Sequence, residues 1–221
     1  MLETEFLNHQ FHPVILFQEK SIWLDLSPSN SELLNVDVSN SHSFSNYIHQ
    51  LLEKNNVEIA VGGYNEKRNI YKRSQNFNSP IEEERFIHLG IDIWIKENTP
   101  VFSPLEGRIH TFKNNTGLGN YGPTLILEHK LNAFKFYTLY GHLSEESLLG
   151  KKVGHKIAQG EQIARLGGAL VNGDYPPHLH FQIIKDLQGM EGDYKGVTSI
   201  SQQKEDLFNC PDPNLMLKIP V

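Results

Sequence analysis

The sequence predicts a mainly β fold, with an antiparallel β domain over residues 61–221 and a small α/β extension over residues 1–60. From residue 86 to residue 184, short apolar or alternating runs such as IDIWI and TLILEH follow one another closely. Gly, Pro and Asn separate these runs, as turn residues do between short strands. Only SEESLLG offers a helical period in this region, so the pattern is typical of antiparallel strands joined by short connections.

The extension predicts one helix among short strands. Residues 1–42 combine apolar runs with Ser- and Asn-rich clusters, which favours one or two strands joined by loops. From Ser43, apolar residues recur at helical spacing, with Ser43 as the expected N-cap and Asn55-Asn56 as the stop. VEIAVGGY then predicts a strand closed by two glycines. Residues 65–85 are polar and charged without a period, so we expect an exposed connection there.

Beyond the β-rich region, residues 185–210 are polar and predict loops, and the tail PDPNLMLKIP is expected to pack back onto the domain. The histidines outside the clustered motifs are interpreted as solvated surface residues. They are His9, His12, His42, His49, His110, His129 and His155. His129 is expected to form a surface pair with Glu128, of little energetic consequence.

Composition excludes several function classes. The chain has 221 residues, of which 38% are hydrophobic and 21% charged, as in a soluble globular protein. Its net charge is −6 at pH 7, and without a block of Lys and Arg a nucleic-acid partner has no electrostatic support. No run reaches the length of a membrane span. The single Cys210 excludes an internal disulfide.

The expected location is the cytoplasm. MLETEFLNHQ carries acidic residues where a signal peptide needs basic ones, and no apolar segment of sufficient length follows it. Export to the cell envelope would then require a non-classical route. The sequence does not indicate an oligomeric state.

Three segments of the β-rich region carry groups that bind metals or transfer protons: HLGID, YGHLS with His142, and HLH. In a fully extended strand, the His88 and Asp92 of HLGID would lie about 13 Å apart. Ligands of one tetrahedral Zn²⁺ lie about 2 Å from the metal, so both residues can bind only if the chain bends between them. Gly90 permits that bend, and the β-branched residues of IDIWI place Asp92 in a strand.

The HLH segment contains His178 and His180 at the start of a predicted strand. Residues i and i+2 of a strand project from one face, about 6.6 Å apart along the backbone. Both imidazoles could bind one metal, or one could bind while the other faces a substrate, and spacing alone does not separate these roles. Pro176-Pro177 stiffens the approach and marks where the strand begins. Three such segments in one β domain, each flanked by Gly or Pro, favour a functional site over solvated histidines.

The ordered set HLGID, YGHLS and PHLHFQ resembles the lysostaphin-type zinc metallopeptidases, whose pattern is an HxxxD motif followed by an HxH motif. The resemblance covers residues 86–184 and includes TPVFSPLEGRI and KIAQGEQIARLG. It implies a lysostaphin-like β domain of the duplicated hybrid motif type, with one Zn²⁺ per chain. The residues that it implies are His88, Asp92 and His180 as zinc ligands, and His142 and His178 as catalytic histidines.

The implied ligand set agrees with the chemistry of a catalytic metal. Two histidines and one carboxylate leave a fourth position of Zn²⁺ open for water, which distinguishes catalytic from structural sites. A neutral imidazole beside the metal can take the proton of the water or form a hydrogen bond to the tetrahedral intermediate. The sequence does not decide which of His142 and His178 is the base.

A closer resemblance extends from about residue 20 to the end of the chain. GGYNEKRNIYKRS, YGPTLILEH, FYTLYGHLS and PDPNLMLKIP look like a subgroup whose peptidase-like module is found joined to a kinase-like phosphotransferase and a pyridoxal-phosphate aminotransferase. The commoner secreted members carry a Ser/Thr/Gly stretch before HLHFE. In this chain the corresponding sequence is NGDYPPHLHFQ, and Gln182 replaces the usual acidic residue.

These features lead to three hypotheses. The first is a zinc metalloendopeptidase that hydrolyses peptide bonds, in family terms those of peptidoglycan cross-links or stem peptides. The second is an intracellular zinc amidohydrolase or peptidase acting on a substrate other than murein. The third is a non-catalytic binding module on the same scaffold, which digestion and zinc-binding measurements distinguish from the first two.

Overall fold

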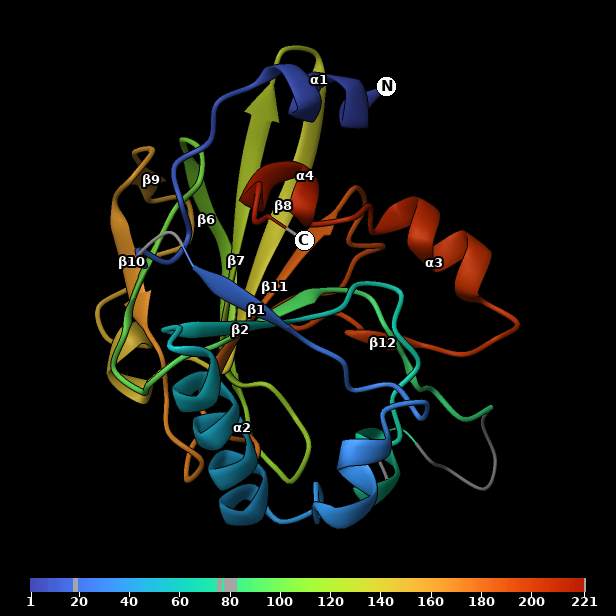
Figure 1. Cartoon of the computed structure of the whole chain (residues 1–221). Helices are drawn as coiled ribbons and strands as arrows, with labels where there is room; N and C mark the ends of the chain where they lie inside the picture. Colours follow the sequence, from blue (N-terminus) through green and yellow to red (C-terminus); the bar gives the residue numbers. More distant parts are fainter. Residues whose placement is uncertain (18–19, 75–76, 78–82, 221) are drawn as a thin grey trace.

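A twisted eight-stranded sheet forms the centre of the protein (Figure 1). The computed structural model describes residues 1–17, 20–74, 77 and 83–220. The strands of the sheet, in spatial order, are β1 (Ser21–Leu24), β2 (Ile59–Gly62), β4 (Ile91–Trp94), β11 (His178–Ile184), β8 (Phe134–Gly141), β7 (Gly122–Leu131), β6 (Gly107–Asn115) and β9 (Lys156–Ile157). β1 and β2 are parallel, and the other neighbours in this sheet are antiparallel. The predicted antiparallel β fold is therefore confirmed.

The sheet twists strongly from one end to the other. In Figure 1, β1 and β2 run across the view, whereas β7 and β8 rise almost vertically. Each strand of a sheet is rotated relative to its neighbour in the same sense, so the twist accumulates over eight strands. β2 spans the predicted boundary and pairs with β1 on one side and β4 on the other, so one sheet continues across residue 60. The division into two domains at residue 60 stays a prediction.

Two small ribbons accompany the main sheet. β5 (Pro100–Phe102) pairs with β10 (Gln162–Arg165), and β3 (Ile87–His88) pairs with β12 (Val197–Thr198). The second ribbon is antiparallel, with Val197 opposite His88. It therefore ties the segment after residue 185 to the strand that carries the first candidate metal ligand.

The helices are short except for α2 (Ser41–Asn55). The others are α1 (Leu2–Asn8), α3 (Gln203–Asn209) and α4 (Asn214–Leu217), with 3₁₀ turns η1 (Ser31–Asn35), η2 (Ile70–Arg73) and η3 (Glu145–Leu148). The predicted α2 is confirmed, and Asn56 ends it in the left-handed conformation. The expected N-cap was wrong, because the side chain of Asn40 accepts the hydrogen bond of the Ser43 amide. In the described residues, no helix is long and apolar enough to cross a membrane.

The two ends of the chain pack together. α1 was not predicted, yet Leu2 and Phe6 lie on one face of it and are buried. The Phe6 ring meets that of Phe136 with centroids 5.0 Å apart. Met216 in α4 and Ile219 just after it belong to the same apolar core, so the expected packing of the tail is confirmed.

Two segments predicted as exposed or irregular contain buried, ordered residues. In the segment 65–85, Arg68 is 2% exposed and Tyr71 is also buried, so the expected exposed connection was wrong at these positions. Residues 75–76 and 78–82 of that prediction lie outside the described residues. The segment 185–210 forms β12 and α3 and buries Tyr194. Several polar residues of these segments, among them Arg68, Arg85 and Lys195, line a cavity, and hydropathy alone cannot separate that situation from exposure to solvent.

His129 is also buried, at 1% exposure, instead of lying on the surface as expected. Its Nδ1 lies 2.8 Å from the carbonyl oxygen of Glu106 and its Nε2 lies 2.8 Å from Thr138 Oγ1. Burial lowers the pKa of His129 from 6.5 to about 4 and outweighs the hydrogen bond to Glu106, which favours the charged form.

This burial makes the stability of the protein depend on pH. Between pH 6.5 and pH 4 the unfolded chain binds a proton at His129 that the folded chain does not, so stability falls as the pH decreases. We expect His129→Gln to remove about 2 kcal/mol of the stability loss between pH 7 and pH 5. Urea denaturation of wild type and variant at both pH values measures this difference. Identical pH dependence in the two proteins would contradict it.

Candidate metal and active site

The pairing of β4 with β11 brings two of the candidate ligands together. In the antiparallel register His180 lies opposite Asp92. Ile91 and Ile93 of β4 belong to the apolar core, whereas Asp92 projects from the other face. In β11, Leu179, Phe181 and Ile183 likewise enter the core. The period of two thus directs His178 and His180 to one face, as predicted, and the pairing of the strands places Asp92 on the same side.

His88 joins these residues from a different sheet. It lies in β3, and the chain crosses to β4 through Leu89 and Gly90. The expected bend is therefore present. Glycine is also required for space, because a Cβ at Gly90 would lie 2.6 Å from Cε1 of His180.

Three candidate ligand atoms meet at one buried point. His88 Nε2 lies 3.0 Å from His180 Nδ1 and 3.3 Å from Asp92 Oδ1, and His180 Nδ1 lies 3.1 Å from the same oxygen. The three side chains are nearly inaccessible to solvent. At about 2 Å from a tetrahedral metal ion, donor atoms lie about 3.3 Å from one another, so the spacing suits such an ion.

The tautomers of the two histidines also favour a cation. His88 Nδ1 is 2.9 Å from the carbonyl oxygen of Gly63, to which it donates. His180 Nε2 is 2.9 Å from Gln182 Oε1. With hydrogens on these two nitrogens, the nitrogen of each ring that faces Asp92 is a lone-pair acceptor. Since none of the three atoms carries a hydrogen to offer the other two, a metal ion is the partner that satisfies all of them.

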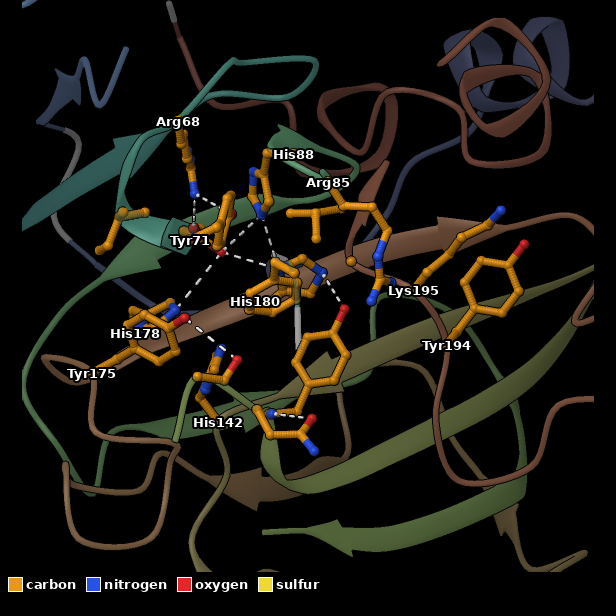
Figure 2. Close-up of a pocket in the computed structure, with 18 of the residues that line it drawn as sticks. Arg68, Tyr71, Arg85, His88, His142, Tyr175, His178, His180, Tyr194 and Lys195 are labelled. Atoms are coloured by element: carbon orange, nitrogen blue, oxygen red, sulfur yellow. Dashed lines mark hydrogen bonds and ion pairs between the residues drawn. The ribbon is translucent and has the colours of Figure 1, made fainter. Parts of the chain in front are cut away.

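The remaining two candidates flank this cluster. His178 Nε2 lies 3.9 Å from Asp92 Oδ1, and the rings of His142 and His178 lie 4.1 Å apart at their centroids. The Nδ1 of His178 donates to the Pro176 carbonyl and that of His142 to the Asn172 carbonyl, both at 2.8 Å. Each ring thus keeps its Nε2 as an acceptor. Figure 2 shows all four histidines around one cavity.

Their surroundings keep both flanking histidines neutral. Burial lowers the pKa of His178 to about 4. Burial, reinforced by His178, moves the pKa of His142 well below its usual range. The His178 ring stacks on Trp94 with centroids 4.0 Å apart, which fixes its plane. His142 has φ +62°, a left-handed conformation that non-glycine residues seldom adopt and that is often found at functional sites.

Comparison with known proteins identifies the domain. Residues 86–193 match the family described as Peptidase family M23. The chain carries an M23 peptidase domain.

The M23 domain has relatives of known name. Over 138 residues the chain is 27% identical to an uncharacterized metalloprotease of Haemophilus influenzae, covering 59% of this chain and 27% of that protein. Over 146 residues it is 28% identical to the peptidoglycan DD-endopeptidase ShyA of Vibrio cholerae, covering 62% of this chain and 31% of that protein. The chain thus spans less than a third of the length of these relatives.

Solved structures of similar sequence are also found. One is a zinc-containing peptidase from Vibrio cholerae, 28% identical, with a TM-score of 0.37 over 47% of this chain and 29% of that chain.

Arg68, which lies outside the residues that match family M23, forms a buried ion pair with Asp92 of the cluster. Arg68 Nη1 lies 2.5 Å from Asp92 Oδ2, and Arg68 Nε lies 2.6 Å from Glu66 Oε2. Burial raises the pKa of Asp92, but His88 and Arg68 outweigh it and hold that pKa well below its usual range. Arg68 occupies the second carboxylate oxygen, so Oδ1 is the one that faces the two histidines.

Arg68 was not predicted as a residue of the site. The signal that could have found it is the pair of glycines after β2, because a Cβ on Gly62 would lie 2.7 Å from Arg68 Nη2. Glycine at that position makes room for the guanidinium beside the strand. The motif GGYNEKRNIYKRS contains both features.

The cavity beside the cluster of His88, Asp92 and His180 has a volume of about 310 Å³. In Figure 2, Arg68 and Tyr71 lie on one side of the histidines, and Arg85, Tyr194 and Lys195 on the other. All five are polar or aromatic residues of the segments 65–85 and 185–210, which were expected to be a connection and loops. The cavity therefore has walls on both sides of the clustered histidines.

Proposed function

We propose that this chain is a zinc-dependent metalloendopeptidase that hydrolyses peptide bonds of peptidoglycan cross-links or stem peptides. One Zn²⁺ per chain would be held by His88, Asp92 and His180. The observation that carries the proposal is the convergence of three acceptor atoms, 3.0 to 3.3 Å apart, beside a cavity lined by two further neutral histidines. Two histidines and one carboxylate form a catalytic zinc set with an open position.

The metal and the flanking residues would divide the chemistry. When bound, zinc supplies Lewis acidity and lowers the pKa of a water molecule. The neutral imidazoles of His142 and His178 can each accept a proton at Nε2 and later donate it to the leaving amine. Their Nδ1–H groups donate to backbone carbonyls, which favours the protonated ring once it forms and keeps its orientation. Either residue fits the role of the general base.

The peptidoglycan substrate is supported by the relative named peptidoglycan DD-endopeptidase. A second candidate, hydrolysis of a smaller amide, is favoured by one observation. Tyr71 and Tyr194 line the cavity, and both lie outside residues 86–193. Arg68, from the same segment as Tyr71, also lines it. Walls of this kind favour a chain end or a small molecule over a cross-linked strand that continues in both directions.

Digestion of purified murein sacculi, with and without a chelator, tests the proposal. Released peptide fragments, identified by mass spectrometry, should disappear with the chelator and return when zinc is added. A zinc-bound protein that leaves murein intact but hydrolyses small amides would favour the second candidate. A protein that binds zinc and hydrolyses neither would be a binding module. A protein that binds no zinc would refute both enzymatic functions.

A further inference from the structure

We infer that Gln182 is a positioning residue for the metal site, and that the two ends of its side-chain amide have different roles. Its carbonyl oxygen selects the tautomer of His180 that binds the metal. Its NH₂ group ties the segment 185–210 to the back of the site. This inference rests on the proposed metal site.

The position of Gln182 follows from the strand. It stands two residues after His180 in β11 and therefore projects from the same face of the sheet. It is fully buried, so each polar atom of its side chain needs a partner within the protein. Gln182 Oε1 lies 2.9 Å from His180 Nε2, on the side of the imidazole opposite Asp92.

The orientation of the amide is determined by the groups at its other end. Gln182 Nε2 lies 3.1 Å from the carbonyl oxygen of Lys195 and 3.2 Å from the sulfur of Cys210. A backbone carbonyl only accepts hydrogen bonds, so the NH₂ group must face Lys195. The reversed amide would place two oxygens together and leave a buried acceptor unsatisfied. The carbonyl oxygen of Gln182 therefore faces His180.

An acceptor at this place selects the proton on His180, and the hydroxyl of Tyr121, 3.3 Å from the same nitrogen, is able to accept as well. Nε2 carries the hydrogen and Nδ1 carries the lone pair, which faces Asp92 Oδ1 and His88 Nε2 at 3.1 and 3.0 Å. In the other tautomer an N–H would occupy the position of the metal. Removing the hydrogen-bond partner of a metal-binding histidine commonly lowers metal affinity 10- to 100-fold.

The segment after the strand is coupled to the metal site through the same side chain. Lys195 and Cys210 both lie in the segment 185–210, and the carbonyl of Cys210 accepts a hydrogen bond of 2.6 Å from Tyr64. An apolar side chain at position 182 would release these contacts along with the one to His180. A carboxylic acid would keep an acceptor for His180 and change only the contacts on the other side.

The test compares the zinc affinity of three variants with that of the wild-type chain, by competition with a chromophoric chelator. Gln182→Met removes the acceptor at similar volume and should bind zinc about 10- to 100-fold more weakly. Gln182→Glu keeps an acceptor and should stay within about tenfold of wild type. Asn115→Leu is the matched control, because it replaces another buried amide, bonded to Thr124 and Gly192, and should bind zinc like wild type.

Two outcomes separate this inference from the proposed function. If wild type binds no zinc, the metal site itself is refuted. If wild type binds zinc and Gln182→Met binds it equally well, only the role of Gln182 is overturned. If Gln182→Met does not fold, the inference is tested on the wild-type protein instead. A long-range ¹H–¹⁵N spectrum of the metal-free protein should show the proton of His180 on Nε2, and a proton on Nδ1 would overturn the inference.

Discussion

Replacing His178 with alanine is expected to leave the metal bound and to lower the rate of hydrolysis about 10²- to 10⁴-fold. The Nε2 of this histidine lies 3.9 Å from Asp92 Oδ1, next to the ligand atoms but outside their 3.0 to 3.3 Å contacts. Its Nδ1 donates a hydrogen bond to the carbonyl oxygen of Pro176. Removing the ring therefore removes a proton acceptor and leaves the three ligand atoms in place.

His88→Ala and Asp92→Ala should lose metal and activity together, since each removes one of three ligand atoms. Zinc content per chain, measured by atomic emission, and initial rates on the same preparations separate the two classes of variant. His129→Gln is the control, because it alters a buried histidine that lies outside the metal cluster and should change neither quantity. Loss of zinc in His178→Ala would place His178 among the ligands and contradict the assignment.

Replacing Arg68 with methionine is expected to lower the free energy of unfolding of the metal-free protein by about 3–5 kcal/mol. Arg68 is 2% exposed, and its guanidinium contacts Asp92 Oδ2 at 2.5 Å and Glu66 Oε2 at 2.6 Å. Methionine fills similar space but leaves both carboxylates without their cation. A buried charge without a partner costs far more than an exposed one.

Arg108 provides a matched control for this variant. Its guanidinium also lies 2.5 Å from a carboxylate, that of Glu128, but the arginine side chain is 58% exposed. Arg108→Met should therefore lower stability by less than about 1 kcal/mol. Urea denaturation in the presence of a chelator measures both variants, and zinc should reduce the loss in Arg68→Met because a cation again neutralises Asp92. An unchanged transition in metal-free Arg68→Met would contradict the role of the buried arginine.

The motif residues could be predicted because their constraints are local. The two-residue period of a strand directs His178 and His180 to one face, whatever the rest of the fold. Pro177 marks the start of β11 and Gly90 allows the chain to leave β3 for β4, and both effects depend on the residue itself. The helix predicted after Ser43, which the structure shows as α2, likewise followed from its own apolar spacing.

The polar residues outside the motifs could not be placed in this way. His129 and Glu128 are neighbours in β7, but at this end of the strand Glu128 and Lys130 face outward, whereas His129 and Leu131 are buried. Which face is buried depends on the packing of α1 and of the core residues around Phe136. The expected surface pair was wrong for that reason.

Strand periodicity and motif spacing predicted which segments carry the histidines and the aspartate of the candidate site, and that His178 and His180 share a face. The surroundings of these residues follow from contacts between distant parts of the chain. Arg68 reaches Asp92 across 24 residues, and Gln182 reaches Cys210 across 28. Contacts of this kind depend on strands paired out of sequence order, β2 with β4 and β4 with β11, which no local pattern specifies. They nevertheless determine which oxygen of Asp92 and which nitrogen of His180 face the metal position.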